Sequence, residues 1–255
     1  MRIMKSPLIL SQNKEETEKV RNVVVTWYEK HQKDKEKEFF NYDLSKRDDR
    51  LKVFILGIFF NCVFQETKAL KIFKEMENRG YITLDKLNDF EQNVKNVIKD
   101  LRRKTDEKYG ILKMQNLVDS VLVAKQVFSK KDDIIGIFKE KNSPREFVVF
   151  LREALHGISV KLFWICREYR NLLGIPEEYC YVPDRHVTKF LHNIKFLAKR
   201  KPFYSLEEYF KISRAMSNYL RNDYFDLPFM RYHQTNCKDK LGCNCEIENC
   251  RWKRS

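Results

Sequence analysis

Glycine and proline are scarce in this chain, whose 255 residues include only 7 Gly and 6 Pro. β-Sandwiches and barrels need many tight turns, and nucleotide-binding α/β folds need glycine-rich loops, so the scarcity argues against both classes. Apolar residues nevertheless make up 43% of the sequence, which is enough for a sizeable buried core. These proportions predict an all-α protein with one large domain or two modest ones.

Long hydrophobic runs are also missing. The most apolar stretch, VFILGIFFNCVF at residues 53–64, is too short to span a bilayer and is expected to form a buried helix. The apolar patch near the N-terminus is too short for a signal peptide and has no small-residue cleavage site. We therefore expect a soluble, cytoplasmic protein that binds no membrane. Its 7 cysteines should be reduced or metal-bound rather than disulfide-bonded.

Acidic residues are outnumbered by basic ones. Lys and Arg total 50 against 36 Asp and Glu, which gives a formal net charge of +14. Such a charge favours polyanionic partners, of which nucleic acid is the commonest, because neutralising its phosphates releases counterions. A general richness in lysine, without functional meaning, is the alternative explanation.

Apolar side chains recur at helical spacing along most of the chain. Ser143-Pro144 begins one helix that runs into the segment 156–159, and a second helix covers roughly residues 160–172. Two helices joined by a four-residue turn form a helical hairpin. Beyond about residue 221 the chain is expected to be irregular. The other predicted helices cover residues 14–39, 50–77, 90–104, 111–130, 185–199 and 205–221.

Four of the seven cysteines fall close together in the segment CKDKLGCNCEIENC. Four such thiolates in an intracellular chain are expected to bind Zn²⁺ or an iron–sulfur cluster, and disulfides or unrelated thiols are the alternative. Arg251 and Lys253 follow this loop, where a phosphate-facing element would need positive charge. The predicted metal ligands are Cys237, Cys243, Cys245 and Cys250.

Two further segments contain residue types suited to catalysis. In LHGISVK, residues 155–161, a glycine-containing turn at a helix N-terminus would form an anion site, and Lys161 lies one turn into the second helix. A buried lysine near other cations can become a neutral, nucleophilic amine. In YVPDRHV, residues 181–187, Asp184 follows a proline and opens a helix. Taken alone, Lys161 is more simply a surface lysine and Asp184 a plain helix cap.

In this order, the three segments resemble the endonuclease III branch of the helix-hairpin-helix DNA glycosylases. The hairpin of that family reads like LPGVGxK, and the sequence here matches it at Leu155, Gly157 and Lys161. The aspartate motif of the family reads like VDxHV, matched here by Asp184 and His186 together with the valine that follows.

A fourth match lies upstream. The family has an apolar helix ending in a glutamine that fills the gap left by a flipped base, and FFNCVFQETKA places Gln65 at that point. The resemblance extends over residues 50–250.

The sequence also departs from the family pattern. His156 replaces a proline, and Ser159 replaces the second glycine, which in the family approaches the DNA backbone closely, so phosphate binding by the hairpin is expected to be altered. Lys161 and Asp184 stand a few residues further apart than is common. The cysteines are separated by five, one and four residues rather than the usual six, two and five. We expect a [4Fe–4S] cluster, with Zn²⁺ as the alternative.

The resemblance implies an enzyme of base excision repair that acts as a monomer on double-stranded DNA with a damaged base or an abasic site. Asp184 would stabilise the positively charged sugar, and Lys161 would form a Schiff base that leads to strand cleavage, so the enzyme would be both a glycosylase and an AP lyase. Gly157, Ser159 and His186, with Gln65, Arg251 and Lys253, would contact the DNA. The excised lesion stays open.

The resemblance also implies two helical subdomains with a cleft between them. One would combine residues 1–49 and 135–255, the other would cover residues 50–134, and the hairpin, residues 146–172, would lie at their junction. Two other interpretations stay open. A non-catalytic, metal-stabilised DNA- or RNA-binding module of the same fold is favoured by the altered hairpin. A helical, zinc-containing interaction protein would explain only the cysteine-rich tail.

Overall fold

The structure is a computed structural model of the whole chain. It describes residues 8–10, 13–32, 42–63, 65–105, 108–109, 111, 114–155, 160–220, 225–238, 242–243, 246–247 and 250, and only the backbone of residues 238, 242 and 243. These residues are helical apart from loops and two strands of two residues each, so the predicted all-α class is confirmed. No helix in this part of the chain is both long and apolar enough to cross a membrane.

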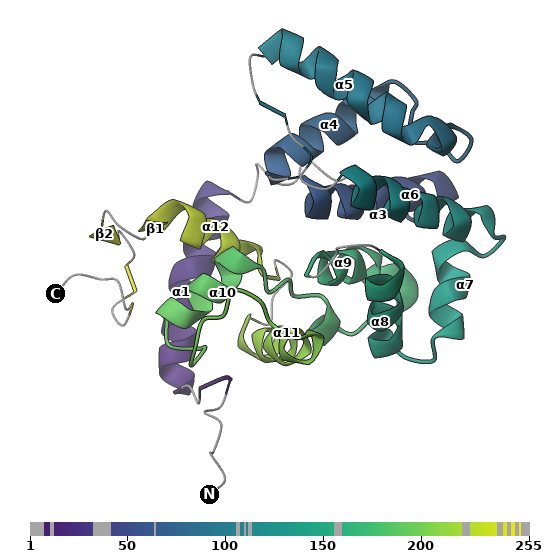
Figure 1. Cartoon of the computed structure of the whole chain (residues 1–255). Coiled ribbons are helices and arrows are strands. Elements are labelled where there is room, and N and C mark those ends of the chain that lie inside the picture. The colour runs from purple at the N-terminus through teal and green to yellow at the C-terminus, as the bar shows by residue number, and fades with distance from the viewer. Residues whose placement is uncertain are drawn as a thin grey trace, which may run out of the picture. The chain divides into compact units, whose positions relative to one another are not determined.

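The chain divides into two compact units, whose elements are labelled in Figure 1. Tyr42–Pro176 forms the central unit, and Met1–Asn41 joins Glu177–Ser255 in the terminal unit. The sequence placed the second boundary at residue 134, whereas the structure places it at residue 176. Residues 135–176, which include the hairpin, therefore belong with the central helices rather than with the C-terminal segment.

The central unit is built around one apolar helix, α3, which contacts α4, α6 and α9. Figure 1 shows α4 and α5 on one side of α3 and α6, and the α8–α9 hairpin on the other. Of the 16 residues of α3, 11 are buried, as expected of a helix that is hydrophobic all round. The elements of this unit are α3 (Arg47–Cys62), α4 (Glu66–Asn78), η1 (Lys86–Asp89), α5 (Phe90–Thr105), α6 (Met114–Ser129), α7 (Asp133–Glu140), α8 (Pro144–Ala154) and α9 (Lys161–Leu173).

The single helix predicted over residues 50–77 is wrong, because the chain breaks between α3 and α4. Val63 is extended, with φ −100° and ψ 137°, and its backbone forms an isolated antiparallel bridge with Ile111. Gln65 is also extended, and α4 begins at the next residue. A periodic apolar pattern cannot reveal this break, since the bridging partner lies far away in the sequence.

A buried ion pair joins the start of α3 to the start of α7. Arg50 donates from Nε and Nη2 to the Oδ2 of Asp133, at 2.9 and 2.5 Å, and from Nη1 to the carbonyls of Leu44 and Ser45 at 2.9 and 2.8 Å. Tyr169 of α9 donates its hydroxyl to the carbonyl of Arg50. Burial, with the charge of Asp133, raises the pKa of Tyr169, so this hydroxyl keeps the proton it donates. The network therefore ties three helices together.

A glycine sets how closely α9 approaches α3. A Cβ at Gly57 would lie 2.8 Å from Cγ1 of Ile165 and 3.1 Å from the ring of Trp164. The Trp164 ring packs edge-on against Phe60, with ring centroids 5.1 Å apart. The aromatic residues near Lys161 are therefore core side chains. Their packing fixes the position of the first turn of α9 against α3.

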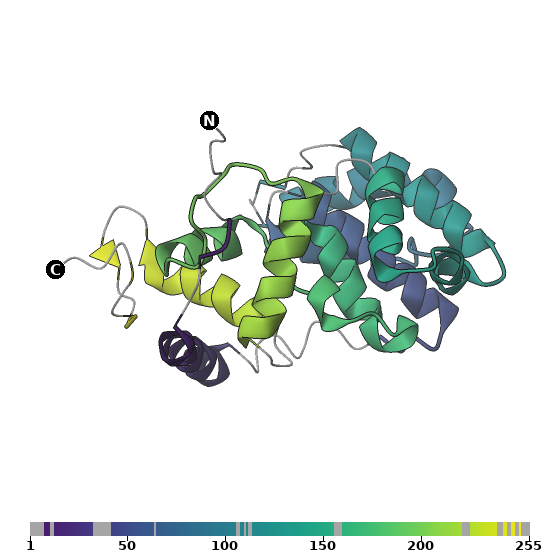
Figure 2. The same ribbon diagram turned by 90° about the horizontal axis from the view of Figure 1, so that it is seen from below.

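The terminal unit packs α10 against α12, and α1 against both α11 and α12. Figure 2 shows α10, α11 and α12 grouped together, with α1 seen close to end-on. The rings of Phe190 and Phe229 lie 4.8 Å apart, and those of Trp27 and Tyr232 lie 5.3 Å apart. The elements of this unit are α1 (Lys14–His31), η2 (Glu177–Tyr179), α10 (Arg185–Asn193), α11 (Leu206–Leu220), α12 (Leu227–Asn236), β1 (Cys237–Lys238) and β2 (Gly242–Cys243).

Two predictions for this unit are corrected. The segment after residue 221 was expected to be irregular, yet Leu227–Asn236 is a helix that begins with a proline in its first turn. The helix predicted over residues 185–199 ends at Asn193, because Lys195 adopts a left-handed conformation with φ 60° and Leu197 forms a backbone bridge with Ile9.

Replacing Arg50 should destabilise the central unit strongly. Arg50→Met leaves the carboxylate of Asp133 buried without its cation, which typically costs about 3–5 kcal/mol. Urea unfolding should report a loss of that size, whereas Arg152→Met, at an exposed position of α8, should change stability by less than about 0.5 kcal/mol. Equal, small losses in both variants would show that the ion pair does not hold the helices.

Candidate functional site

Lys161 is the first residue of α9. The structure begins this helix at Lys161 with Val160 as its N-cap, so the lysine does not lie one turn inside the helix as predicted. The preceding helix α8 ends at Ala154 and packs against α9. The turn that joins them, with Gly157 and Ser159, lies outside the described residues.

The residues that follow Lys161 in the first turn of α9 carry no charge. The side chain of Lys161 is half-buried, and the first turn of α9 has no acidic residue. Leu162 and Phe163, which follow it, are fully buried. The N-terminus of a helix is the positive end of its dipole, where cations are normally unfavourable. No described carboxylate forms an ion pair with Lys161. Among these residues, a surface salt bridge therefore does not account for the position of the lysine.

Asp184 is the N-cap of α10, as predicted. Its Oδ1 accepts hydrogen bonds from the backbone N–H groups of His186 and Val187 at 2.8 and 2.9 Å. Its backbone carbonyl accepts from the hydroxyl of Thr188 at 2.8 Å. Both capping bonds use the same carboxylate oxygen. Oδ2 accepts no hydrogen bond from the described residues, so one oxygen holds the helix and the other stays available.

A buried aspartate that the sequence did not single out supports this segment. Asp226, only 2% exposed at the start of α12, accepts a hydrogen bond at its Oδ1 from the backbone N–H of Val182 at 2.9 Å. The ring of Tyr181 packs edge-on against Phe225 beside it, with centroids 5.2 Å apart. The two residues before Pro183 are thus attached to α12, and they set where Asp184 is presented. No local pattern signals this, because the partners are 44 positions apart.

His186, predicted to contact DNA, turns toward the interior of its own unit. Its Nδ1 lies 3.4 Å from Nδ1 of His233, which is 4% exposed on α12. Arg185 donates from Nε to Nε2 of His186 at 3.4 Å. The guanidinium can only donate, so Nε2 of His186 is the acceptor in this contact, while its Nδ1 lies within hydrogen-bond distance of His233. His186 therefore connects the start of α10 to α12.

Gln65 lies on the surface of the central unit. It is exposed, and its backbone carbonyl accepts from the N–H of Ala69 at 2.9 Å, so the residue is the N-cap of α4. Its side chain makes no capping hydrogen bond. The prediction of a helix ending in this glutamine is corrected, since Gln65 starts the second helix after the break.

The predicted metal loop is only partly described. Cys237 and Cys250 are buried, at 7% and 6% exposed, and Cys237 lies opposite Cys243 in the two-stranded ladder of β1 and β2. The loop is attached to α12 by the hydroxyl of Tyr232, which accepts from the N–H of Glu246 at 3.0 Å.

The described residues do not complete a metal site. Among them, no group of three or more His, Cys, Asp or Glu side chains is placed to hold a metal ion. The side chain of Cys243 is not described, and Cys245, Arg251 and Lys253 lie outside the described residues. The two described thiols and the ladder register are compatible with a four-cysteine site.

The predicted catalytic residues belong to different units. Lys161 begins a helix of the central unit, and Asp184 begins a helix of the terminal unit. Each stands at a helix N-terminus, where backbone N–H groups favour negative charge in a ligand. Comparisons with models of protein families, with curated proteins and with solved structures find no match for this chain.

Removing the side-chain acceptor of Asp226 should loosen the segment before Asp184. Asp226→Ala leaves the buried N–H of Val182 without its partner, a loss of about 1–3 kcal/mol. Hydrogen exchange should show faster exchange of the Val182 amide in this variant. Asp226→Asn provides a side-chain amide oxygen that can accept the same hydrogen bond. In that variant the Val182 amide should therefore exchange about as slowly as in the unchanged protein. Unchanged protection in Asp226→Ala would show that the bond does not fix this segment.

Proposed function

We propose that this protein is a DNA glycosylase with AP lyase activity, which excises a damaged base from duplex DNA through a Schiff base on Lys161. The observation that supports this most is the setting of Lys161: a half-buried lysine at the positive end of α9, directly after the hairpin turn, without a described carboxylate partner. A lysine used for ordinary solubility is normally exposed and needs no such position.

Asp184 supplies the other group that the chemistry needs. A base inside a duplex must be flipped out before an enzyme can reach its glycosidic bond. As the bond between C1′ and the base breaks, positive charge develops on the sugar, and a carboxylate close to C1′ stabilises it. Oδ2 of Asp184 is the oxygen for this role, because Oδ1 is used by the helix cap.

Lys161 then forms a covalent bond to the sugar. Its neutral amine forms a bond to C1′ as the base leaves with the electron pair of the glycosidic bond, and opening of the sugar ring gives a protonated Schiff base. Removal of a proton from C2′ expels the 3′ phosphate and cleaves the strand. Gln65, exposed at the start of α4, fills the gap that the flipped base leaves in the duplex.

The cysteine loop holds a [4Fe–4S] cluster, with Zn²⁺ as the alternative, on Cys237, Cys243, Cys245 and Cys250. Support comes from the burial of the two described thiols and from the ladder pairing of Cys237 with Cys243. When bound, such a group fixes the loop by metal–thiolate bonds. It would hold Arg251 and Lys253 beside the DNA backbone.

Borohydride trapping tests the role of Lys161. The protein incubated with abasic DNA should form a covalent adduct on reduction, because borohydride reduces a Schiff base to a stable amine. Lys161→Ala should abolish the adduct, while Lys139→Ala, at an exposed position of α7 in the same unit, should leave it unchanged. An adduct that survives Lys161→Ala would exclude Lys161 as the nucleophile.

Asp184→Asn separates capping from catalysis. Asparagine caps a helix about as well as aspartate, so the free energy of unfolding should change little. The negative charge beside the sugar is lost, and base release should slow by about 100-fold or more, within the range for losing one electrostatic contact to a transition state. Trapping on a preformed abasic site should persist, since the glycosidic bond is already broken there. Base release at the original rate would rule out a catalytic role for Asp184.

A non-catalytic DNA- or RNA-binding module is the second candidate function. It is favoured by His156 and Ser159, which replace the proline and glycine of the family hairpin. An oligonucleotide panel carrying oxidised pyrimidines, 8-oxoguanine, and mismatched uracil or thymine separates the two functions, because release of any of these bases requires the enzyme.

A further inference from the structure

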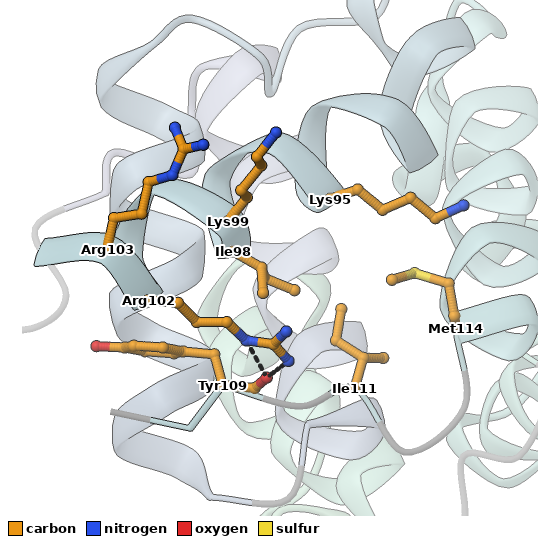
Figure 3. A pocket seen from close by; sticks show the side chains of 8 residues that line it. All are labelled: Lys95, Ile98, Lys99, Arg102, Arg103, Tyr109, Ile111 and Met114. Carbon is orange, nitrogen blue, oxygen red and sulfur yellow. Dashed lines mark hydrogen bonds between the residues drawn. The ribbon is translucent and has the colours of Figure 1, made fainter. Parts of the chain in front are cut away.

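The central unit has a surface pocket of about 560 Å³ on one face of α5. Figure 3 shows four basic side chains around it: Lys95, Lys99, Arg102 and Arg103, all exposed. Their spacing along α5 is i, i+4, i+7 and i+8, which places them on one side of the helix over about 12 Å. A volume of this size suits a ligand of a few tens of atoms or one section of a polymer.

Most of this positive charge is not neutralised. Lys95 forms an ion pair with Glu91 at 2.5 Å, one helical turn away. Arg103 lies only at 4.0 Å from Asp100, whose other oxygen receives a 2.9 Å hydrogen bond from Arg79.

Lys99 has no carboxylate partner among the described residues, and Arg102 faces a carbonyl instead of an acid. The rim of the pocket therefore keeps a net positive charge that an anionic ligand could neutralise.

Arg102 is fixed in place before any ligand binds. It donates from Nε, at 3.1 Å, and from Nη2 to the backbone carbonyl of Tyr109. Nη1 takes no part in this interaction, as the dashed lines in Figure 3 indicate. A guanidinium held in this way loses little side-chain freedom when its remaining N–H groups bind a phosphate.

The floor of the pocket is apolar. Ile98 of α5, Ile111 and Met114 of α6 contribute apolar side chains to its lining. Ile111 is held there by its backbone bridge to Val63. A site for a simple inorganic anion would need no apolar floor, whereas a nucleotide presents both phosphate charge and the weakly polar faces of its sugar and base.

We propose that this pocket is a second DNA contact, in which the basic residues of α5 bind consecutive backbone phosphates of one strand and the apolar floor takes a sugar or base face between them. The inference rests on the proposed function for its choice of DNA as the polymer. The overall charge of +14 and the 12 Å row of cations favour a nucleic-acid strand over an acidic peptide, whose charges have no regular spacing.

The test changes two cations that make no structural hydrogen bond in the described chain. Lys99→Gln/Arg103→Gln removes two charges from the rim and leaves the anchored Arg102 intact. The matched control, Lys130→Gln/Lys131→Gln, removes two exposed charges from the segment between α6 and α7 of the same unit. Circular dichroism should show equal helix content and similar melting temperatures for the two double variants.

Binding of the full-length chain to a fluorescein-labelled, undamaged duplex is measured by anisotropy at several salt concentrations. The slope of log K against log salt should become shallower by about 2 in the Lys99→Gln/Arg103→Gln variant, because two phosphate contacts are lost. The Lys130→Gln/Lys131→Gln control should keep the original slope. Equal slopes in the two variants would overturn the proposal.

Competition identifies the source of the phosphate. Inorganic pyrophosphate, dAMP and a poly-glutamate peptide are each titrated against the labelled duplex in the same assay. If none of the three competes in the micromolar range, and the salt dependence of the Lys99→Gln/Arg103→Gln variant is shallower, the pocket binds a DNA strand. Micromolar competition by pyrophosphate or dAMP would instead assign the pocket to a free phosphate compound, and competition by poly-glutamate would assign it to an acidic peptide.

These results are independent of the proposed enzyme activity. Undamaged duplex gives no base release, so the slope tests the pocket even if the trapping experiment fails. A shallower salt dependence in the Lys99→Gln/Arg103→Gln variant, without any borohydride adduct of the unchanged protein, would support the pocket as a DNA contact and reject the glycosylase. A borohydride adduct together with an unchanged salt dependence in that variant would support the enzyme activity and reject the pocket as a DNA contact.

Discussion

The buried ion pair between Arg50 and Asp133 is the contact on which the central unit depends. An isolated charge inside a protein costs several kcal/mol, so neither residue is tolerated there without the other. Arg50 uses its guanidinium to bind Asp133 and two backbone carbonyls, while its own carbonyl receives the hydroxyl of Tyr169. One residue thereby fixes the start of α3, the start of α7 and the middle of α9. Because α9 begins at Lys161, the position of that amine depends on this polar contact as well as on apolar packing.

A similar arrangement serves the terminal unit. Asp184 caps α10, Asp226 holds the residues just before it, and His186 connects α10 to His233 of α12. The same helix α12 leads directly into the cysteine loop at Cys237. A group that fixes this loop would therefore also restrain the surroundings of Asp184. In both units, the residue proposed for catalysis begins a helix to which a buried polar contact is made, at Val182 just before α10 and at Tyr169 in the middle of α9.

Much of the helical framework could be predicted from the sequence, because apolar periodicity and caps are local signals. The helices α8 and α9, the cap at Asp184 and the buried character of α3 all came from such patterns. The features that were missed depend on distant partners. The break at Val63 needs Ile111, the early end of α10 needs Ile9, and α12 packs against α1 at the other end of the chain. For the site, residue types could be predicted, whereas the roles of Asp226 and His233 required the packing.

The discontinuous terminal unit has a consequence for how the chain is made. α1 is synthesised before the central unit, yet the helices it packs against, α11 and α12, are synthesised after it. With the whole central unit translated in between, at about 5–20 residues per second, α1 waits on the order of ten seconds or more for its partners. During that time Val20, Val24 and Tyr28, which are buried in the finished unit, stay exposed to solvent and to chaperones. The central unit, whose sequence is continuous, can complete its core while α1 is still waiting.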